Sequence, residues 1–143
     1  MIHPTAASSV IAFDVGEARI GVAAAGVPAL LPRPLTTLAN DREIMHDIVA
    51  LAQRERALCV VIGLPRGLQG QATAQTRAVE AFGHDLEQHL GIPLYWQDEA
   101  VTSKQAEQEL EARGKPYKKG DIDALAATYI LEDFIRDHKD KIV

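Results

Sequence analysis

The sequence predicts an α/β fold in which a mixed five-stranded sheet is flanked by helices. Short β-branched apolar runs alternate with segments of helical periodicity along most of the chain, which is typical of strands joined by helices. Strands joined by a helix run parallel to each other. The first two apolar runs are instead joined by only Gly16-Glu17-Ala18, which favours an antiparallel hairpin. A hairpin that continues into parallel strands gives a mixed sheet.

The first part of the chain is predicted to be extended. Residues 8–15 are apolar and β-branched as far as Phe13, and Gly16 then ends the strand. Residues 19–25 form the second strand of the hairpin. A third extended segment covers residues 29–38, where prolines in and beside the segment weaken strand pairing.

Helices and strands alternate in the rest of the chain. We expect helices over residues 42–55, 72–90, 102–111 and 122–137, and strands over residues 57–62 and 92–97. Asn40 or Asp41 is expected to cap the first helix, Gly91 to end the second and Asp121 to cap the last.

Length and composition indicate one domain over residues 1–143, with 47% hydrophobic and 24% charged residues. No apolar stretch approaches the roughly 20 residues of a membrane span, and the first residues lack a signal-peptide pattern. Cys59, the single cysteine, lies inside an apolar run and fits a buried thiol in a reducing compartment. We therefore expect a cytoplasmic protein without membrane contact.

Carboxylates stand at the ends of three core segments. Asp14 ends the first strand, Asp98-Glu99 follows a later one, and Asp123 begins an Ala-rich helix on the border of its apolar face. An ionised carboxylate beside a core is costly unless it is compensated. Adjacent strand residues point to opposite faces, so only one of Asp98 and Glu99 is expected to share a site with the others.

A divalent cation is the simplest compensation for several carboxylates in one place. The histidines show no metal-ligand spacing, and oxygen ligands favour Mg²⁺ or Mn²⁺ over zinc. The chemistry most often built on such sites is two-metal hydrolysis of phosphodiester bonds. In that arrangement Asp14 would bridge both ions, while Asp123 and one of Asp98 or Glu99 would hold one each.

Nucleic-acid binding is harder to reconcile with the total charge, because 15 Lys and Arg face 20 Asp and Glu, for a net charge of −5. One local stretch is basic without any acid, from Arg113 through Lys115, Lys118 and Lys119 to Gly120. We expect this loop to lie beside the acidic site and contact phosphates, together with Arg19 and Arg66.

Four segments together resemble a known family. Their sequences are Ile11-Ala12-Phe13-Asp14-Val15-Gly16 with Arg19-Ile20-Gly21-Val22-Ala23, then Val61-Ile62-Gly63-Leu64-Pro65 with Gly70, then Asp98-Glu99 with Thr102-Ser103 and Ala106, and last Lys118-Lys119-Gly120 with Ile122-Asp123-Ala124-Leu125-Ala126-Ala127. In this order, and over nearly the whole chain, they resemble the YqgF family, also called RuvX, of Holliday-junction-resolvase-like nucleases.

The resemblance implies an RNase H-like fold and a cytoplasmic bacterial nuclease. It implies a role in maturing the 5′ end of 16S ribosomal RNA precursors, and junction resolution has also been proposed for the family. Carried over residue by residue, it makes Asp14, Asp98 or Glu99, and Asp123 the candidate metal ligands. The chain departs from the family at Ala100, where the third motif usually has an arginine. Loss of that arginine would weaken the grip on substrate.

Other functions stay open from the sequence. One is resolution of Holliday junctions in DNA, and another is a non-catalytic rRNA-binding or ribosome-assembly factor that uses the basic loop without a metal. The Asp-x-Gly hairpin also occurs in actin-like and sugar-kinase ATPases, but the chain is too short for their second nucleotide-binding lobe. The sequence does not decide between a monomer and a homodimer.

Overall fold

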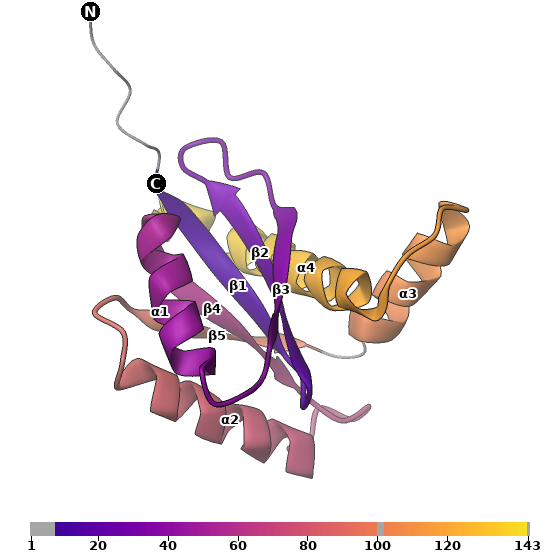
Figure 1. Cartoon of the computed structure of the whole chain (residues 1–143), viewed down its shortest axis with the longest axis horizontal. Helices are drawn as coiled ribbons and strands as arrows, with labels where there is room; N and C mark the ends of the chain where they lie inside the picture. The colour runs from indigo at the N-terminus through magenta and orange to yellow at the C-terminus, as the bar shows by residue number, and fades with distance from the viewer. Residues whose placement is uncertain (1–7, 100–101, 143) are drawn as a thin grey trace, which may run out of the picture.

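The fold was analysed in a computed structural model, which describes residues 8–99 and 102–142. The centre of the molecule is a five-stranded sheet with the order β3-β2-β1-β4-β5 (Figure 1). Its strands are β1 Ser9–Val15, β2 Arg19–Gly26, β3 Arg33–Ala39, β4 Ala57–Pro65 and β5 Leu94–Glu99. The predicted five-stranded sheet is confirmed, with the strand that carries Asp14 at its centre.

The strand directions also agree with the prediction of a mixed sheet. β1 and β2 form the antiparallel hairpin, in which Asp14 pairs with Gly21, and β2 pairs antiparallel with β3. On its other side β1 pairs parallel with β4, which pairs parallel with β5. The carboxyl ends of β1, β4 and β5 therefore meet at one edge of the sheet, where ligands collect in α/β proteins.

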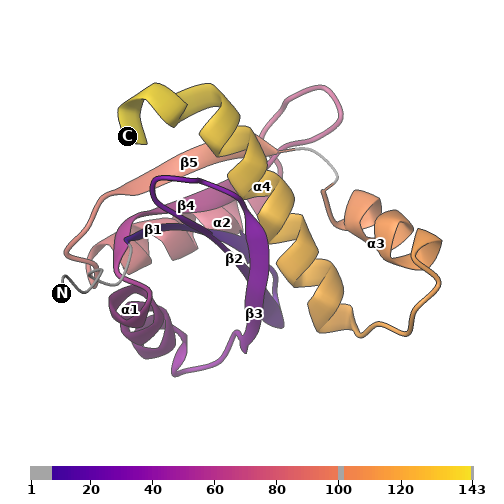
Figure 2. The ribbon, with the colours of Figure 1, turned by 90° about the horizontal axis from the view of Figure 1, so that it is seen from above.

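Helices cover both faces of the sheet. They are α1 Ile44–Arg54, α2 Ala74–Glu87, α3 Thr102–Ala112 and α4 Lys119–Ile142. α1 and α2 lie on one face and α4 crosses the other, while α3 packs against α4 away from the sheet (Figure 2). No helix within the described ranges is long and apolar enough to cross a membrane.

Alternation along β1 divides the core into two layers. Ile11 and Phe13 are buried on the face covered by α1 and α2, whereas Val10 and Ala12 are buried on the face covered by α4. The α4 layer uses small residues, including Ala23 on β2 and Ala127 on α4, so the helix backbone can approach the sheet closely. This close approach positions the site described below.

Several element boundaries differ from the sequence prediction. β4 and β5 run to Pro65 and Glu99, beyond the predicted ends, because Gly63, Leu64 and Pro65 pair with Gln97, Asp98 and Glu99. α2 ends at Glu87 before Gly91 is reached. α1 begins after Glu43, without a side-chain cap from Asn40 or Asp41, although the Asp41 carboxylate accepts the Glu43 N–H at 2.9 Å.

The start of α4 also needs a correction. The helix begins at Lys119, two residues before the predicted cap Asp121. Asp121 lies in the first turn, and its carboxylate accepts the backbone N–H of Lys118 at 2.8 Å. This is one of the two hydrogen bonds of a capping box, the one in which the N3 side chain accepts the backbone N–H of the N-cap residue. It ends the irregular connection at Lys118 and places Lys119 and Gly120 in the helix.

Candidate active site

Asp14 is placed on the α4 face by the strand alternation. It follows Val10 and Ala12 on that side of β1, and its side chain is half-buried at the carboxyl end of the central strand. A carboxylate in this position has an apolar core behind it and solvent in front. The sequence prediction for Asp14, at the ligand-binding edge of the sheet, agrees with this placement.

Asp123 reaches Asp14 because the backbone of α4 lies directly on β2. A Cβ atom added to Gly21, the hairpin partner of Asp14, would lie 1.9 Å from the carbonyl oxygen of Asp123. Only glycine leaves room for this contact, which is a common reason for a glycine within a strand. The contact fixes the first turns of α4 beside the end of β1 and so brings two carboxylates from distant parts of the chain together.

The pKa of Asp14 reflects its burial and the nearby Asp123 carboxylate. Burial, and then the nearby charge of Asp123, raise the pKa of Asp14 from 3.8 to about 7. The first cause is the larger, because the half-buried carboxylate loses much of its hydration. The contribution of Asp123 acts in the direction predicted from like charges held close together, and burial adds the larger part of the rise.

Arg19 compensates one of the two carboxylates. Its Nε donates to Oδ2 of Asp123 at 2.6 Å, with the Arg19 side chain 41% exposed and that of Asp123 16% exposed. The sequence suggested a phosphate contact for Arg19, whereas the structure pairs it with Asp123. Such a pair fixes the orientation of the Asp123 carboxylate relative to Asp14.

The structure separates Asp98 from Glu99. Alternation along β5 places Tyr95, Gln97 and Glu99 on the α4 face, because they pair with Val61, Gly63 and Pro65. Asp98 points to the opposite face, where it is 68% exposed and accepts from Nε of Arg66 at 3.3 Å. Glu99 alone of this pair therefore shares a face with Asp14 and Asp123.

Glu99 is poorly compensated. Its Oε1 is buried without a hydrogen-bond partner, and the nearby α4 residues Asp133 and Asp137 add negative charge. Burial, and then the Asp133 carboxyl, raise the pKa of Glu99 well above its ordinary value, while Arg136 acts in the opposite direction. A buried carboxylate oxygen without a partner is rare in folded proteins and fits a position reserved for a cation.

The acidic residues at this end of the sheet form two separate pairs in the structure. Within residues 8–99 and 102–142, no group of three or more Asp, Glu, His or Cys residues is assembled to hold a metal ion. Asp14 and Asp123 form one pair, and Glu99 and Asp133 form the other. Oxygen donors, the unpartnered Glu99 Oε1 and the raised pKa of Asp14 nevertheless all fit a hard divalent cation.

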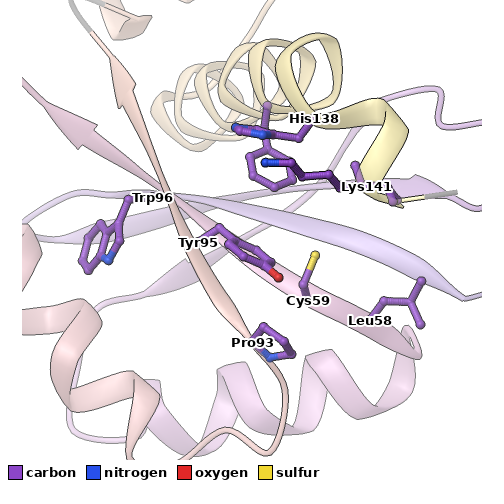
Figure 3. Close-up of a pocket in the computed structure, with 9 residues that line it drawn as sticks. Leu58, Cys59, Pro93, Tyr95, Trp96, His138 and Lys141 are labelled. Carbon is purple, nitrogen blue, oxygen red and sulfur yellow. The ribbon is translucent and has the colours of Figure 1, made fainter.

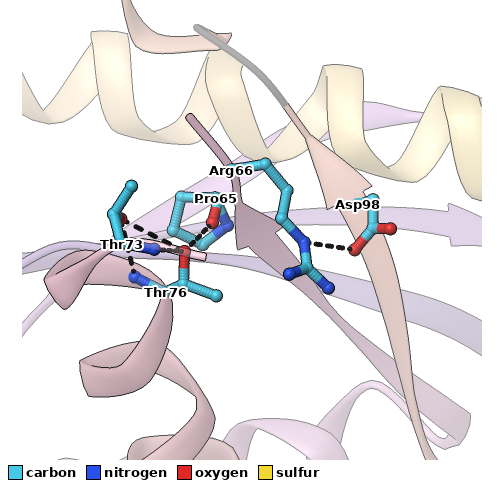
Figure 4. A network of polar contacts seen from close by, with 5 residues as sticks. All are labelled: Pro65, Arg66, Thr73, Thr76 and Asp98. Atoms are coloured by element: carbon cyan, nitrogen blue, oxygen red, sulfur yellow. Dashed lines mark hydrogen bonds and ion pairs between the residues drawn. The ribbon is translucent and has the colours of Figure 1, made fainter. Parts of the chain in front are cut away.

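The loop after β4 is held firmly at the same edge of the sheet. Thr73 and Thr76 form a reciprocal capping box at the start of α2, and the Thr76 hydroxyl also donates to the Pro65 carbonyl (Figure 4). Arg66, which follows Pro65, is thereby kept next to Asp98. The sequence singled out Arg66 but gave no sign of the buried Thr76 that anchors it.

The remaining basic residues lie around the α3–α4 connection. Arg113 forms an ion pair with Glu109 of the preceding helix turn, and Lys115 lies on a surface depression with Tyr117 and Asp121. Lys119 precedes Asp123 by one turn of α4. The Gly120 carbonyl accepts from the Thr37 hydroxyl at 2.6 Å, which ties this end of α4 to β3. Ala100, the departure from the family pattern, lies outside the described residues.

Comparison with known proteins decides the family. The family model RuvX, described as Holliday junction resolvase, matches residues 8–137. The chain belongs to the RuvX family. The match confirms the family resemblance and the nuclease assignment that the sequence motifs predicted.

Curated RuvX relatives match over most of their length. A protein of Chloroflexus aurantiacus is 41% identical over 130 residues, which cover 88% of this chain and 85% of the relative. A protein of Crocosphaera subtropica is 32% identical over 139 residues, covering 94% and 97%. Both carry the name "Putative pre-16S rRNA nuclease".

A solved structure supports the fold. T. thermophilus RuvC in complex with a Holliday junction substrate superposes with a TM-score of 0.53 and 19% identity, covering 90% of this chain and 95% of that one. This likeness confirms the RNase H-like fold predicted for the RuvX chain. At this level of identity it speaks for the fold alone.

Proposed function

We propose that this RuvX protein is a metal-dependent nuclease that hydrolyses phosphodiester bonds in structured nucleic acid, with the 5′ end of pre-16S rRNA as its substrate. The observation that carries the proposal is the Asp14–Asp123 pair, held on the α4 face by the contact at Gly21. The names of the curated relatives support the choice of substrate. The proposal treats residues 1–143 as one domain and places the protein in the cytoplasm, where rRNA precursors are processed.

Asp14 and Asp123 would hold Mg²⁺ or Mn²⁺, and Glu99, which lies on the same face but in the second acidic pair, is the candidate for a further ligand. Such ions supply water activation and neutralisation of charge on the phosphate when they are bound. Arg19 keeps the Asp123 carboxylate oriented, and the raised pKa of Asp14 means that its proton must leave before a cation can be held. Activity should therefore rise with pH through about 7, the pKa of Asp14.

Phosphate contacts are assigned to the basic residues around this edge. Lys118 and Lys119 stand at the start of the helix that carries Asp123, and Arg113 and Lys115 precede them in the connection from α3. Arg66 and Arg19 lie on the sheet side, where each already has a carboxylate partner. These residues would position the nucleic-acid backbone without recognising its sequence.

The test is cleavage of a structured pre-16S rRNA 5′ end with Mg²⁺, with Mn²⁺ and with EDTA. We expect cleavage with either metal and none with EDTA. Cleavage that continues in EDTA would rule out the metal site. RNA binding without cleavage under every condition would indicate an assembly factor.

A second substrate deserves the same assay, because the family description concerns Holliday junctions. A four-way DNA junction and its linear duplex arms should be compared with the RNA at equal concentration. Preference for the junction would identify the protein as a resolvase. We expect preference for the RNA.

Glu99→Gln and Asp98→Asn form a matched pair that tests the choice between the two neighbours. We expect Glu99→Gln to lower metal-dependent activity by at least roughly 10- to 100-fold, the loss that follows even removal of an outer-shell partner of a metal. Asp98→Asn breaks only an exposed pair with Arg66 and should leave activity within about threefold of the parent. The measurement is the initial cleavage rate across a Mg²⁺ series. The reverse order of effects would make Asp98 the ligand.

A further inference from the structure

A second pocket lies on the α4 face, at the opposite end of the sheet from the Asp14–Asp123 pair. It has a volume of about 330 Å³ and is formed by the beginnings of β4 and β5 and the last turns of α4 (Figure 3). Cys59, which lines it, precedes Gly63 by four residues on β4. At roughly 3.3 Å per residue the pocket is therefore about 13 Å from the carboxylate edge along the strand.

Three stacked rings build one side of this pocket. The Tyr95 and Phe134 rings are 5.7 Å apart at an interplanar angle of 31°, and the Phe134 and His138 rings are 4.7 Å apart at 42°. Phe134 is buried, whereas Tyr95 is 46% exposed. In Figure 3 the Tyr95 ring projects from β5 into the open space below His138 and Lys141. The stack thus ends in an aromatic ring that another planar group can cover.

The pocket also carries positive charge. α4 has a non-helical backbone at His138, and the turn that follows places Lys141 and Ile142 in the lining of the same pocket as Leu58 and Cys59 of β4. Among the described residues that line the pocket, Lys141 is charged and none is a carboxylate. The nearby Asp137 is engaged outside the pocket by Gln97 and Arg136.

Thiol chemistry does not account for the pocket. Burial raises the pKa of Cys59 to about 11, so the thiol stays protonated and is a poor nucleophile. It contributes an apolar wall. The pocket combines this wall with an open aromatic face and a cation at the rim, which suits a planar aromatic ligand that carries negative charge.

We propose that this pocket binds one unpaired nucleotide, with its base stacked on Tyr95 and its phosphate held by Lys141. Sites for single-stranded nucleic acid pair stacking rings with cations in this way. The volume lies at the lower end of small-molecule pockets, about 300–1,000 Å³, which suits a single nucleotide. If the protein cleaves structured RNA as proposed above, the pocket is a subsite for an unpaired nucleotide near the cleavage point.

The test is photo-crosslinking and binding in EDTA, so that the result does not depend on cleavage. A short single-stranded oligonucleotide with 5-iodouridine, the same sequence as a blunt duplex, and uridine monophosphate are compared. We expect crosslinks from the single strand to the peptide that contains Tyr95 and few from the duplex. Binding of the monophosphate without the strand would assign the pocket to a free nucleotide. If neither the single strand nor the monophosphate binds, the proposal is overturned.

Matched variants separate the stack from the charge. Tyr95→Leu should weaken single-strand binding by roughly 5- to 150-fold, the range of base stacking on one aromatic residue, whereas Tyr95→Phe should retain it. Lys141→Gln should weaken binding and lower its salt dependence by about one phosphate contact. Lys139→Gln, on the same turn but outside the pocket lining, is the control. Unchanged binding in both Tyr95→Leu and Lys141→Gln, with thermal melts intact, would also refute the proposal.

Discussion

Replacing Gly21 with alanine should unfold or severely weaken the protein. The new Cβ would lie 1.9 Å from the carbonyl oxygen of Asp123 and 2.7 Å from the backbone nitrogen of Ala124. Both are backbone atoms of a helix that is buried against the sheet, so no side-chain rotation relieves the clash. We expect a loss of about 3 kcal/mol or more in the free energy of unfolding, at the upper end of overpacking effects. Thermal and urea denaturation measure the loss.

The same strand provides the control. Gly26 is also on β2, and a Cβ added there would meet nothing within 4 Å. Gly26→Ala should therefore change stability by no more than about 1 kcal/mol, with a gain expected from the smaller entropy of the unfolded chain. If Gly21→Ala behaves like Gly26→Ala, then α4 does not lie on β2 as the structure describes.

A second readout connects this packing to the site. Any Gly21→Ala protein that still folds must move the first turns of α4 away from β2, and Asp123 moves with them. The pKa of Asp14 should then fall, because the contribution from the Asp123 charge decreases. Carboxyl NMR titration of the folded fraction measures this change. Cleavage activity should fall as well, since the two carboxylates no longer share a site.

The fold was predictable because its signals are local. The hairpin follows from three residues between two apolar runs, and the parallel strands follow from the helices that join them. Asp14 and Asp123 could be paired in advance for the same reason. One ends the central strand, and the other continues the helix stripe of Ala127 and Ile130, both of which are buried.

The local sequence pattern could not decide between Asp98 and Glu99. Strand alternation says that they face opposite ways, but which of them faces the active site depends on the side that α4 covers. That side is set by contacts between distant segments, such as Gly63 with Ile130 and Tyr95 with Phe134. The partner of Arg19, 104 residues away in sequence, was hidden for the same reason. Gly21, in the interior of β2, and the alanines of α4 were sequence hints of this close approach.

Asp14→Asn should remove activity and stabilise the metal-free protein at the same time. If Asp14 holds the metal as proposed, its loss should lower cleavage by roughly 100-fold or more, since outer-shell partners alone are worth about 10- to 100-fold. The gain in stability follows from the pKa of Asp14, which is raised from 3.8 to about 7. Between these values the unfolded chain is ionised while the folded chain keeps its proton, so stability falls as the pH rises from about 4 to about 7.

The expected size of the gain is about 2–4 kcal/mol near pH 8 in EDTA, because the full pKa difference is worth about 4 kcal/mol and the half-buried carboxylate keeps part of its hydration. Near pH 4 the two proteins should differ by less than about 1 kcal/mol, because this pH is close to the unfolded-state pKa of 3.8 and only a small part of the pH-linked difference has developed. Asp85→Asn, which removes an exposed carboxylate on α2, is the control. Urea denaturation of the three proteins across this pH range, with and without Mg²⁺, measures the difference.

Saturating Mg²⁺ should stabilise the parent at high pH and leave Asp14→Asn nearly unchanged, because only the parent can exchange the Asp14 proton for the cation. A parent protein that grows more stable from pH 4 to pH 8 in EDTA, relative to Asp14→Asn, would show that Asp14 is compensated by a partner other than a metal.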